Sequence, residues 1–299
     1  MKALLGFALL VSTLSVHAQS YVLQMNGTLL TQDAEGRVYD LNQFVNPNNI
    51  VGRGKNWLLD RQQLVTTISN KGFVFKKTDM KGPKGIKASG DSWFISDKGE
   101  MNVVTREGLL FTYTLDQFKK SDVLLAGGNW LTLREGSQVS FVTIDTVKGF
   151  TYTLTPQVLA GIGLNPMNIK EKGGNYFVDS AGVLFTVDRN GLVANKKTMG
   201  LFAANKKLGS NYLVDAKGGV RVVLDNGWML LPNLPANMGS LNKTGTTHAW
   251  DTKGQFFTFA ETAPDAEVSS NNPAVFNGVL SKLVLQPVEQ VDERTLLSR

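Results

Sequence analysis

Four aspartates recur at one position of a repeating pattern, and carboxylates set in a regular array can ligate a metal ion or act as an acid and a base. They lie three residues after an aromatic residue or its counterpart, at Asp60, Asp179, Asp215 and Asp251. Most of them begin a short Asp-x-x-Gly segment, in which the aspartate caps its own hairpin turn through hydrogen bonds to nearby backbone. We therefore expect turn capping, with no metal bound.

The repeated aromatic residues offer a second kind of chemistry. They are Tyr21, Trp57, Trp93, Trp130, Tyr176 and Tyr212, and His248 takes the same place in the last repeat. Exposed rings would be stacking platforms for sugars, one in each repeat unit. Buried rings would pack between neighbouring units, since large aromatic side chains dominate the energetics of cores and interfaces. We expect packing, with His248 as a partly buried, hydrogen-bonded member of the series.

The supply of catalytic residues is poor. The chain has no cysteine, and loss of a leader would leave His248 as its only histidine. A metal site with cysteine ligands or several histidines is therefore excluded, and Ser/His/Asp catalysis would have to use that one side chain. We expect no catalytic residue, no cofactor and no metal. A pair of acids from different repeat units stays open, because such a pair leaves no local spacing.

Clustered lysines form the candidate binding surface. With the leader removed, the chain has 30 basic and 25 acidic residues, a net charge of about +5. Lysines in comparable loops of different units would present one positive face to an acidic protein or an anionic polymer, and solvated loop lysines are the alternative. The candidates are Lys76, Lys77, Lys81, Lys84, Lys119, Lys120, Lys196, Lys197, Lys206 and Lys207. The insertion around Gly161 to Asn168 is a second candidate surface, because it departs from the repeat.

Two glycine positions give the repeat a single register. Successive aromatic positions are 36, 36, 37, 46, 36 and 36 residues apart. Gly27, Gln63, Gly99, Gly136, Gly182, Gly218 and Gly254 follow them by six residues, and Gly36, Gly72, Gly108, Gly149, Gly191 and Gly227 form a second series. We expect Gln63 to make the turn of the second unit different. The long fourth interval indicates loop insertions, one of them around Leu159 to Pro166.

Each unit holds about four short β-prone segments separated by Asp, Asn and Gly turns. Such units, repeating every 36 to 46 residues, are typical of propeller blades. The predicted fold class is all-β, a seven-bladed β-propeller of four-stranded blades. Unit one starts at Tyr21 and lacks the apolar segment that precedes every later aromatic position. We expect Val275–Phe276 and residues 279–285 to supply that strand, completing blade one and closing the ring.

The first residues predict export. Met1 and Lys2 precede an apolar segment that is too short to span a bilayer, and Val16 and Ala18 suit cleavage by a signal peptidase. We expect a signal peptide over 1–18, the propeller over 19–287 and a C-terminal tail over 288–299. The mature chain would be periplasmic or secreted, with no transmembrane segment.

Some turn segments resemble those of known propeller families. Asp179-Ser-Ala-Gly182 resembles the turns of quinoprotein-type propellers, but it is one residue shorter and lacks the tryptophan four positions later. Ser96-Asp97-Lys98-Gly99 resembles the middle of a sialidase Asp-box without its Thr-Trp. The unit as a whole is similar to tectonin-like and WD-type repeats, without the Gly-His and Trp-Asp marks of WD repeats. These resemblances imply a seven-bladed propeller architecture and no particular activity.

Together these patterns favour an exported, noncatalytic propeller of the bacterial envelope that binds or scaffolds an envelope or extracellular protein. A multivalent carbohydrate-binding lectin and a polysaccharide hydrolase with an acid pair in the funnel are the alternatives. We do not expect a nucleic-acid partner, because export removes the usual one and the aromatic residues are assigned to packing. The sequence leaves the oligomeric state open.

Overall fold

The architecture was obtained from a computed structural model of the chain. The structure describes residues 22–23, 29–32, 38–41, 44–69, 73–77, 85–196, 205–215, 218–231, 239–244, 248–253, 256–259, 275–276 and 285–286. The predicted signal peptide and C-terminal tail lie outside these residues. No helix in the described part of the chain is long and apolar enough to cross a membrane.

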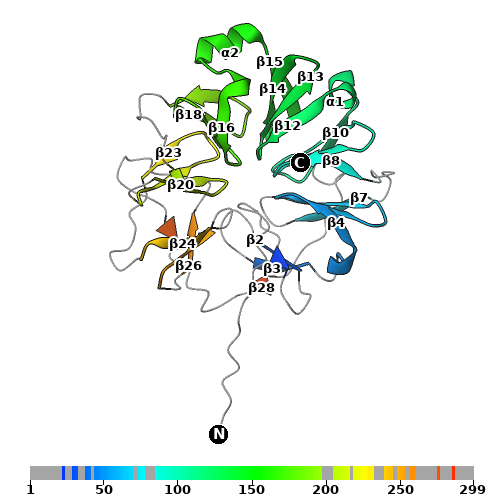
Figure 1. Cartoon of the computed structure of the whole chain (residues 1–299). Coiled ribbons are helices and arrows are strands. Elements are labelled where there is room, and N and C mark those ends of the chain that lie inside the picture. The colour runs from blue at the N-terminus through cyan, green and yellow to red at the C-terminus, as the bar shows by residue number, and fades with distance from the viewer. Residues whose placement is uncertain are drawn as a thin grey trace.

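The described strands pair into seven four-stranded sheets, which stand side by side around a common centre (Figure 1). We number the sheets 1 to 7 in chain order. Sheet 1 contains β1 (Val22–Leu23), β2 (Leu29–Gln32), β3 (Val38–Asp40) and β28 (Leu285–Gln286). Sheet 2 contains β4 (Ile50–Arg53), β5 (Trp57–Asp60), β6 (Val65–Ile68) and β7 (Val74–Lys77). Sheet 3 contains β8 (Ile86–Ser89), β9 (Trp93–Ser96), β10 (Met101–Val104) and β11 (Leu110–Tyr113).

The remaining sheets follow the same order. Sheet 4 contains β12 (Asp122–Ala126), β13 (Trp130–Glu135), β14 (Gln138–Asp145) and β15 (Phe150–Leu154). Sheet 5 contains β16 (Ile169–Lys172), β17 (Tyr176–Asp179), β18 (Leu184–Val187) and β19 (Val193–Asn195). Sheet 6 contains β20 (Asn205–Leu208), β21 (Tyr212–Asp215), β22 (Val220–Val223) and β23 (Met229–Leu230). Sheet 7 contains β24 (Leu241–Thr244), β25 (His248–Asp251), β26 (Phe256–Phe259) and β27 (Val275–Phe276).

The core lies between consecutive sheets. In sheets 2 to 6 the second and third strands are mostly buried, whereas the residues of most described first and fourth strands are partly buried or exposed, namely those of β4, β8, β11, β12, β15, β16 and β19. One hydrophobic cluster joins Trp93 of sheet 3 to Leu131 of sheet 4, and another joins Trp130 of sheet 4 to Phe177 of sheet 5. A neighbour covers each face of these sheets, so their middle strands are buried on both sides. This arrangement of four-stranded antiparallel sheets is that of a β-propeller.

The repeated glycines lie in the turns, as the sequence predicts. All eight described members of the two series have φ between 60° and 86°. Gln63 replaces a glycine, yet it also has φ of 67°, and its N–H donates to the Asp60 carbonyl at 3.0 Å. Gly182 makes the same bond to Asp179. The expectation of a different turn at Gln63 was wrong, because the Asp60 carboxylate, which accepts from the N–H groups of Gln62 and Leu64, holds the loop in the common conformation.

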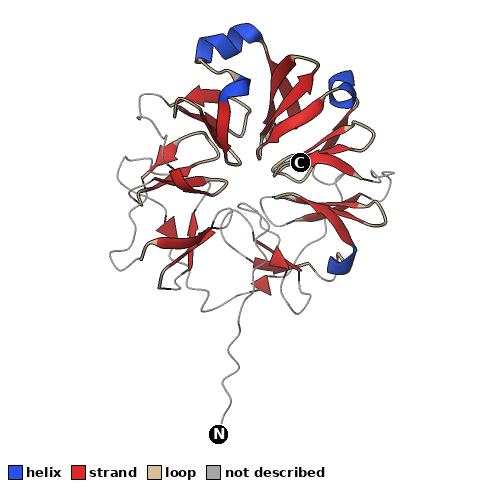
Figure 2. Cartoon of the chain, viewed as in Figure 1, coloured by secondary structure: helices blue, strands red, loops and turns tan. Residues whose placement is uncertain are grey.

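The connections contain short helices, which the sequence did not predict. Two α-helices, α1 (Asp116–Lys120) and α2 (Pro156–Ile162), and two 3-10 helices, η1 (Pro47–Asn49) and η2 (Pro166–Asn168), lie on the outer side of the sheets (Figure 2). The insertion expected to be a loop around Leu159 therefore contains α2. The Thr155 hydroxyl caps this helix, Pro156 starts it, and Gly163 ends it in the left-handed conformation.

The C-terminal segment divides between two sheets. β27 pairs with β26 in sheet 7, so the expectation that Val275–Phe276 joins the first sheet was wrong. β28 does join sheet 1, but it pairs with β3 and runs parallel to it. The strand missing before Tyr21 would lie at the other edge, beside β1.

Replacement of Gln63 by glycine tests the turn. The Gln63→Gly variant is expected to be more stable by about 1 kcal/mol, because a side chain at positive φ is strained and glycine is not. Gly218→Ala is the opposite change at an equivalent turn, where a Cβ would meet no atom within 4 Å, and it should lose a similar amount. Urea unfolding measures both. Equal stability of Gln63→Gly and Gln63→Ala would contradict the assignment of strain.

Candidate functional site

The turns that precede the aromatic residues share a motif that the periodicity analysis missed. Each has glycine, any residue, asparagine or serine, and then the aromatic residue. The five described examples are Gly54-Lys-Asn-Trp57, Gly90-Asp-Ser-Trp93, Gly127-Gly-Asn-Trp130, Gly173-Gly-Asn-Tyr176 and Gly209-Ser-Asn-Tyr212. The signal was present in the sequence, because these residues recur in the same register as the aromatic positions.

The glycine of this motif allows the aromatic ring to fold over the turn. A Cβ on Gly54 would lie 2.0 Å from Trp57 Nε1, and a Cβ on Gly209 would lie 2.1 Å from a ring carbon of Tyr212. All five described aromatic residues are fully buried. Trp57 packs on Phe94 of the next sheet with ring centroids 4.6 Å apart. The packing interpretation is therefore confirmed for these five rings, and none of them is available as a sugar-stacking platform. His248 has a described backbone in β25 only.

The asparagine of the motif joins one sheet to the next. Asn129 of sheet 4 donates from Nδ2 to the carbonyls of Val187 and Asp188 in sheet 5, at 3.0 and 2.7 Å. Asn56 makes the same pair of bonds from sheet 2 to sheet 3, and Asn175 makes it from sheet 5 to sheet 6. Sheet 3 has Ser92 at this position.

Two series of backbone hydrogen bonds also link successive sheets. In the turns between first and second strands, each backbone N–H donates to a backbone carbonyl of the next sheet over 2.5 to 3.1 Å. The pairs are Lys55 to Asp91, Asp91 to Gly128, Gly128 to Gly174 and Gly174 to Ser210. In the turns between third and fourth strands, the backbone N–H groups of Arg106, Thr146 and Arg189 donate to the backbone carbonyls of Thr146, Arg189 and Asp225 respectively, over 2.6 to 2.9 Å. We call these two series the inter-sheet hydrogen-bond belts. They satisfy turn N–H and C=O groups that burial would otherwise leave without partners.

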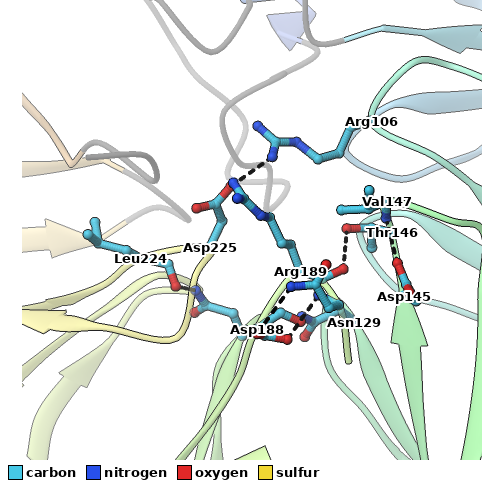
Figure 3. A network of polar contacts seen from close by, with 11 residues as sticks. Arg106, Asn129, Asp145, Thr146, Val147, Asp188, Arg189, Leu224 and Asp225 are labelled. Carbon is cyan, nitrogen blue, oxygen red and sulfur yellow. Dashed lines mark hydrogen bonds and ion pairs between the residues drawn. The ribbon is translucent and has the colours of Figure 1, made fainter. Parts of the chain in front are cut away.

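A charged network lies where these turns converge. The Asp225 carboxylate of sheet 6 forms ion pairs with the guanidinium groups of Arg106 of sheet 3, at 3.5 Å, and Arg189 of sheet 5, at 3.6 Å (Figure 3). The Arg106 side chain therefore reaches from sheet 3 to sheet 6. These ion pairs join three different sheets at one carboxylate.

A small hollow opens beside this network. Its volume is about 50 Å³, and its lining includes Lys55, Asp91, Asn129, Arg189 and Asp225. One water needs roughly 10–15 Å³ by this measure, so there is room for about four waters. Ligand pockets usually have volumes of ~300–1,000 Å³. Asp91 and Asp225, two acids from different sheets, both line the hollow.

The repeated aspartates cap turns. Asp179 Oδ1 accepts from the N–H groups of Ala181 and Val183, and Asp215 Oδ1 accepts from Gly219. Asp251 accepts from Gly239 and Lys253. The turn interpretation is confirmed at these positions and at Asp60. In the described part of the chain, no three His, Asp or Glu side chains form a group that could hold a metal ion.

The candidate lysines are distributed over several sheets. Lys119 and Lys120 lie in α1, and Lys120 Nζ is 3.3 Å from Asp116 Oδ2. Lys196 directly follows β19, and partial burial lowers its pKa. The backbones of Lys76, Lys77, Lys206 and Lys207 lie in β7 and β20, and Lys81, Lys84 and Lys197 lie outside the described residues. Most of the candidate lysines with a described backbone lie near the connections between sheets, at the strand ends opposite the hollow. A shared lysine surface stays a prediction.

The insertion from Gly161 to Asn168 packs onto sheet 5. Leu164 is buried with Phe177 and Phe185, and Asn195 Nδ2 donates to the Ile162 carbonyl at 2.8 Å. The Asn168 carbonyl accepts from Ser180 N–H. Leu164 thus covers the sheet, whereas most residues of the insertion stay exposed, with Met167 at 66%.

No family model and no curated protein matches the chain. Similar solved structures include one described as streptogramin B lyase, with 14% identity, a TM-score of 0.32, and coverage of 82% of this chain and 89% of that chain. Another is PorZ, described as an essential bacterial surface component of the type-IX secretion system of Porphyromonas gingivalis. It has 13% identity, a TM-score of 0.25, and coverage of 81% of this chain and 37% of that chain. The fold assignment rests on the strand pairing of the chain itself.

Substitution of Asn129 tests the side-chain link between sheets. Asn129→Ala is expected to lower the free energy of unfolding by about 2 kcal/mol, because two buried carbonyls lose a donor. Asn129→Asp should cost more, since it places carboxylate oxygens against those carbonyls. Asn190→Ala, in an exposed turn, is the control and should cost less than about 0.5 kcal/mol. Urea unfolding measures all three, and equal losses at Asn129 and Asn190 would contradict the link.

Tyr176 gives a pH-dependent test of the same region. Its hydroxyl lies 2.8 Å from the carbonyl oxygens of Gly209 and Tyr212, and burial, with smaller contributions from Tyr212 and Glu171, raises its pKa well above the usual value. Above about pH 10 the unfolded state loses this proton first, so stability falls as pH rises. Tyr176→Phe should be less stable by about 1 kcal/mol near neutral pH. Its deficit should shrink above about pH 10, and a deficit that stays constant in unfolding measurements would contradict the burial effect.

Proposed function

We propose that the chain is an exported, noncatalytic seven-bladed β-propeller that binds or scaffolds a protein of the bacterial envelope. In this proposal sheets 1 to 7 are the blades, and β28 contributes to closing the ring between the two chain ends. The signal peptide predicted over 1–18 supports export. The lysines near the sheet connections are the proposed contact surface, with Lys119 and Lys120 as its described exposed members.

The small size of the central hollow carries the proposal. Most polar groups there are engaged in the inter-sheet belts, in the asparagine links and in the ion pairs of Asp225, although the buried Oδ1 atoms of Asn129 and Asn175 have no hydrogen-bond partner among the described residues. The described residues beside them line a hollow of about 50 Å³, which suits bound water better than a substrate. Binding is therefore assigned to the outside of the sheets, where loops and helices on a rigid scaffold can form a protein contact.

Charge reversal on α1 tests the proposal. The mature protein, immobilised and exposed to envelope extract, is expected to capture a discrete protein in a fixed ratio. Lys119→Glu with Lys120→Glu should reduce that capture about tenfold, because reversed charge at a contact opposes association. Lys148→Glu is the matched control, since this exposed lysine lies in a turn at the other end of its sheet and should leave capture unchanged.

The outcomes separate the functional classes. Loss of capture with the α1 variant alone would support the lysine surface. Equal capture by all variants would move the contact away from α1. Absence of a protein partner together with binding on a glycan array would contradict the proposal and favour a lectin.

A further inference from the structure

The two edges of each sheet differ. The first strands of sheets 2 to 7 all contain a shift in pairing register near their start, between Ile50/Gly52, Ile86/Ala88, Val123/Leu125, Ile169/Glu171, Asn205/Lys207 and Leu241/Lys243. Such bulges disturb an edge and discourage the addition of another strand. The fourth strands β7, β11, β15, β19 and β23 pair without such a shift. The fourth-strand edge is therefore the one suited to accept a further strand.

Sheet 1 shows this edge occupied. β1 begins one residue after Tyr21, so β3 holds the position that β7 holds in sheet 2. β28 lies along β3 in parallel, with Leu285 opposite Val38 and Gln286 opposite Tyr39. An extended segment of this chain thus pairs with a fourth-strand edge.

β15 is the fourth strand best suited to do the same for a partner. It is the longest described one, its sequence Phe-Thr-Tyr-Thr-Leu has no charge, and Phe150 and Tyr152 are 46% and 41% exposed. Within the described residues its backbone pairs only with β14. An exposed, uncharged, regular edge is a template for strand addition.

Two other fourth strands, β7 and β11, have features that oppose strand addition. β7 ends in Lys76 and Lys77, and lysine on an edge strand discourages pairing. Residues 111–115 repeat the sequence of β15, but there Phe111 is partly buried and the Tyr113 hydroxyl donates to the Gly149 carbonyl at 2.6 Å. The phenylalanine and tyrosine of this segment are therefore less accessible in sheet 3 than in sheet 4.

Positive charge adjoins one end of β15. The Thr153 hydroxyl donates to Gln117 Oε1 of α1 at 3.1 Å, and Lys119 and Lys120 follow on the same helix. A strand that extends beyond Thr153 would approach these lysines. An acidic residue at that end would be complementary to them.

We propose that β15 is a docking edge for an extended segment of a partner protein, paired through the backbone as β28 is paired to β3. Apolar side chains of the segment lie against Phe150 and Tyr152, and an acidic residue at its C-terminal end faces α1. The proposal rests on the proposed protein-binding function, and names the partner chemistry and the edge that receives it.

A synthetic peptide tests the edge directly. The probe has the sequence of residues 279–286, Val-Leu-Ser-Lys-Leu-Val-Leu-Gln, followed by two glutamates, and it is added to the mature full chain. Amide hydrogen exchange should slow at residues 150–154. Replacing the two glutamates by lysines should weaken binding about tenfold, because like charges would then meet at α1.

Methylated peptides distinguish backbone pairing from simple apolar adsorption. Two probes carry methyl groups on alternate amide nitrogens, one on each set. Only one set of amides faces the edge in a strand pair, so one probe should bind like the parent and the other should lose binding. Equal binding of both would overturn the proposal, as would slowed exchange at residues 38–40 in place of 150–154.

Protein variants complete the test. Phe150→Lys with Tyr152→Lys should lose peptide binding, and Val158→Lys on α2, an equally exposed site, should keep it.

Protection of residues 150–154 that depends on protein concentration without peptide would assign the edge to a second copy of the chain and overturn the proposal. If the peptide does not bind but envelope capture persists, only the docking edge fails. If the peptide binds but no envelope protein is captured, the proposed function fails.

Discussion

The structure depends on the hydrogen bonds that cross from each sheet to the next. A sheet in this arrangement has both faces covered, so the turns at its inner end are removed from much of the solvent together with their backbone polar groups. The inter-sheet belts satisfy these groups, and the side chains of Asn56, Asn129 and Asn175 add two bonds at each of three junctions. Because an unsatisfied buried polar group costs more than a bond gains, these links fix how neighbouring sheets must align.

The aromatic residues and the asparagines act together in that alignment. Glycine three residues before each ring lets the ring lie over the turn, and the ring then fills the space between two sheets. The asparagine immediately before the ring lies at the same junction and bonds the next sheet. Apolar packing thus supplies the contact area. The hydrogen bonds from the asparagine side chains select one register, since a shift by one residue would separate the side-chain NH₂ groups from their carbonyl acceptors.

Much of the fold could be predicted from the sequence because its determinants are local. A turn aspartate, a glycine at positive φ and an aromatic residue each act within a few residues of chain, and their common period revealed the four-stranded units. Features that depend on tertiary context were missed. Gln63 adopts a glycine conformation because Asp60 holds the turn, α2 forms within an insertion because its capped helix can bury Leu159, and β28 pairs with β3 instead of β1.

The charged network at the centre is beyond sequence reasoning for the same reason. Arg106 and Asp225 belong to sheets 3 and 6, and no local spacing connects them. Their ion pair, with Arg189, lies beside a hollow of about 50 Å³ that described residues of several sheets line. Residues that differ between repeat units and lie at the strand edges and outer connections are therefore the ones best placed to determine which partner is bound. There the exposed side chains of β15 and α1 are not needed to hold the sheets together.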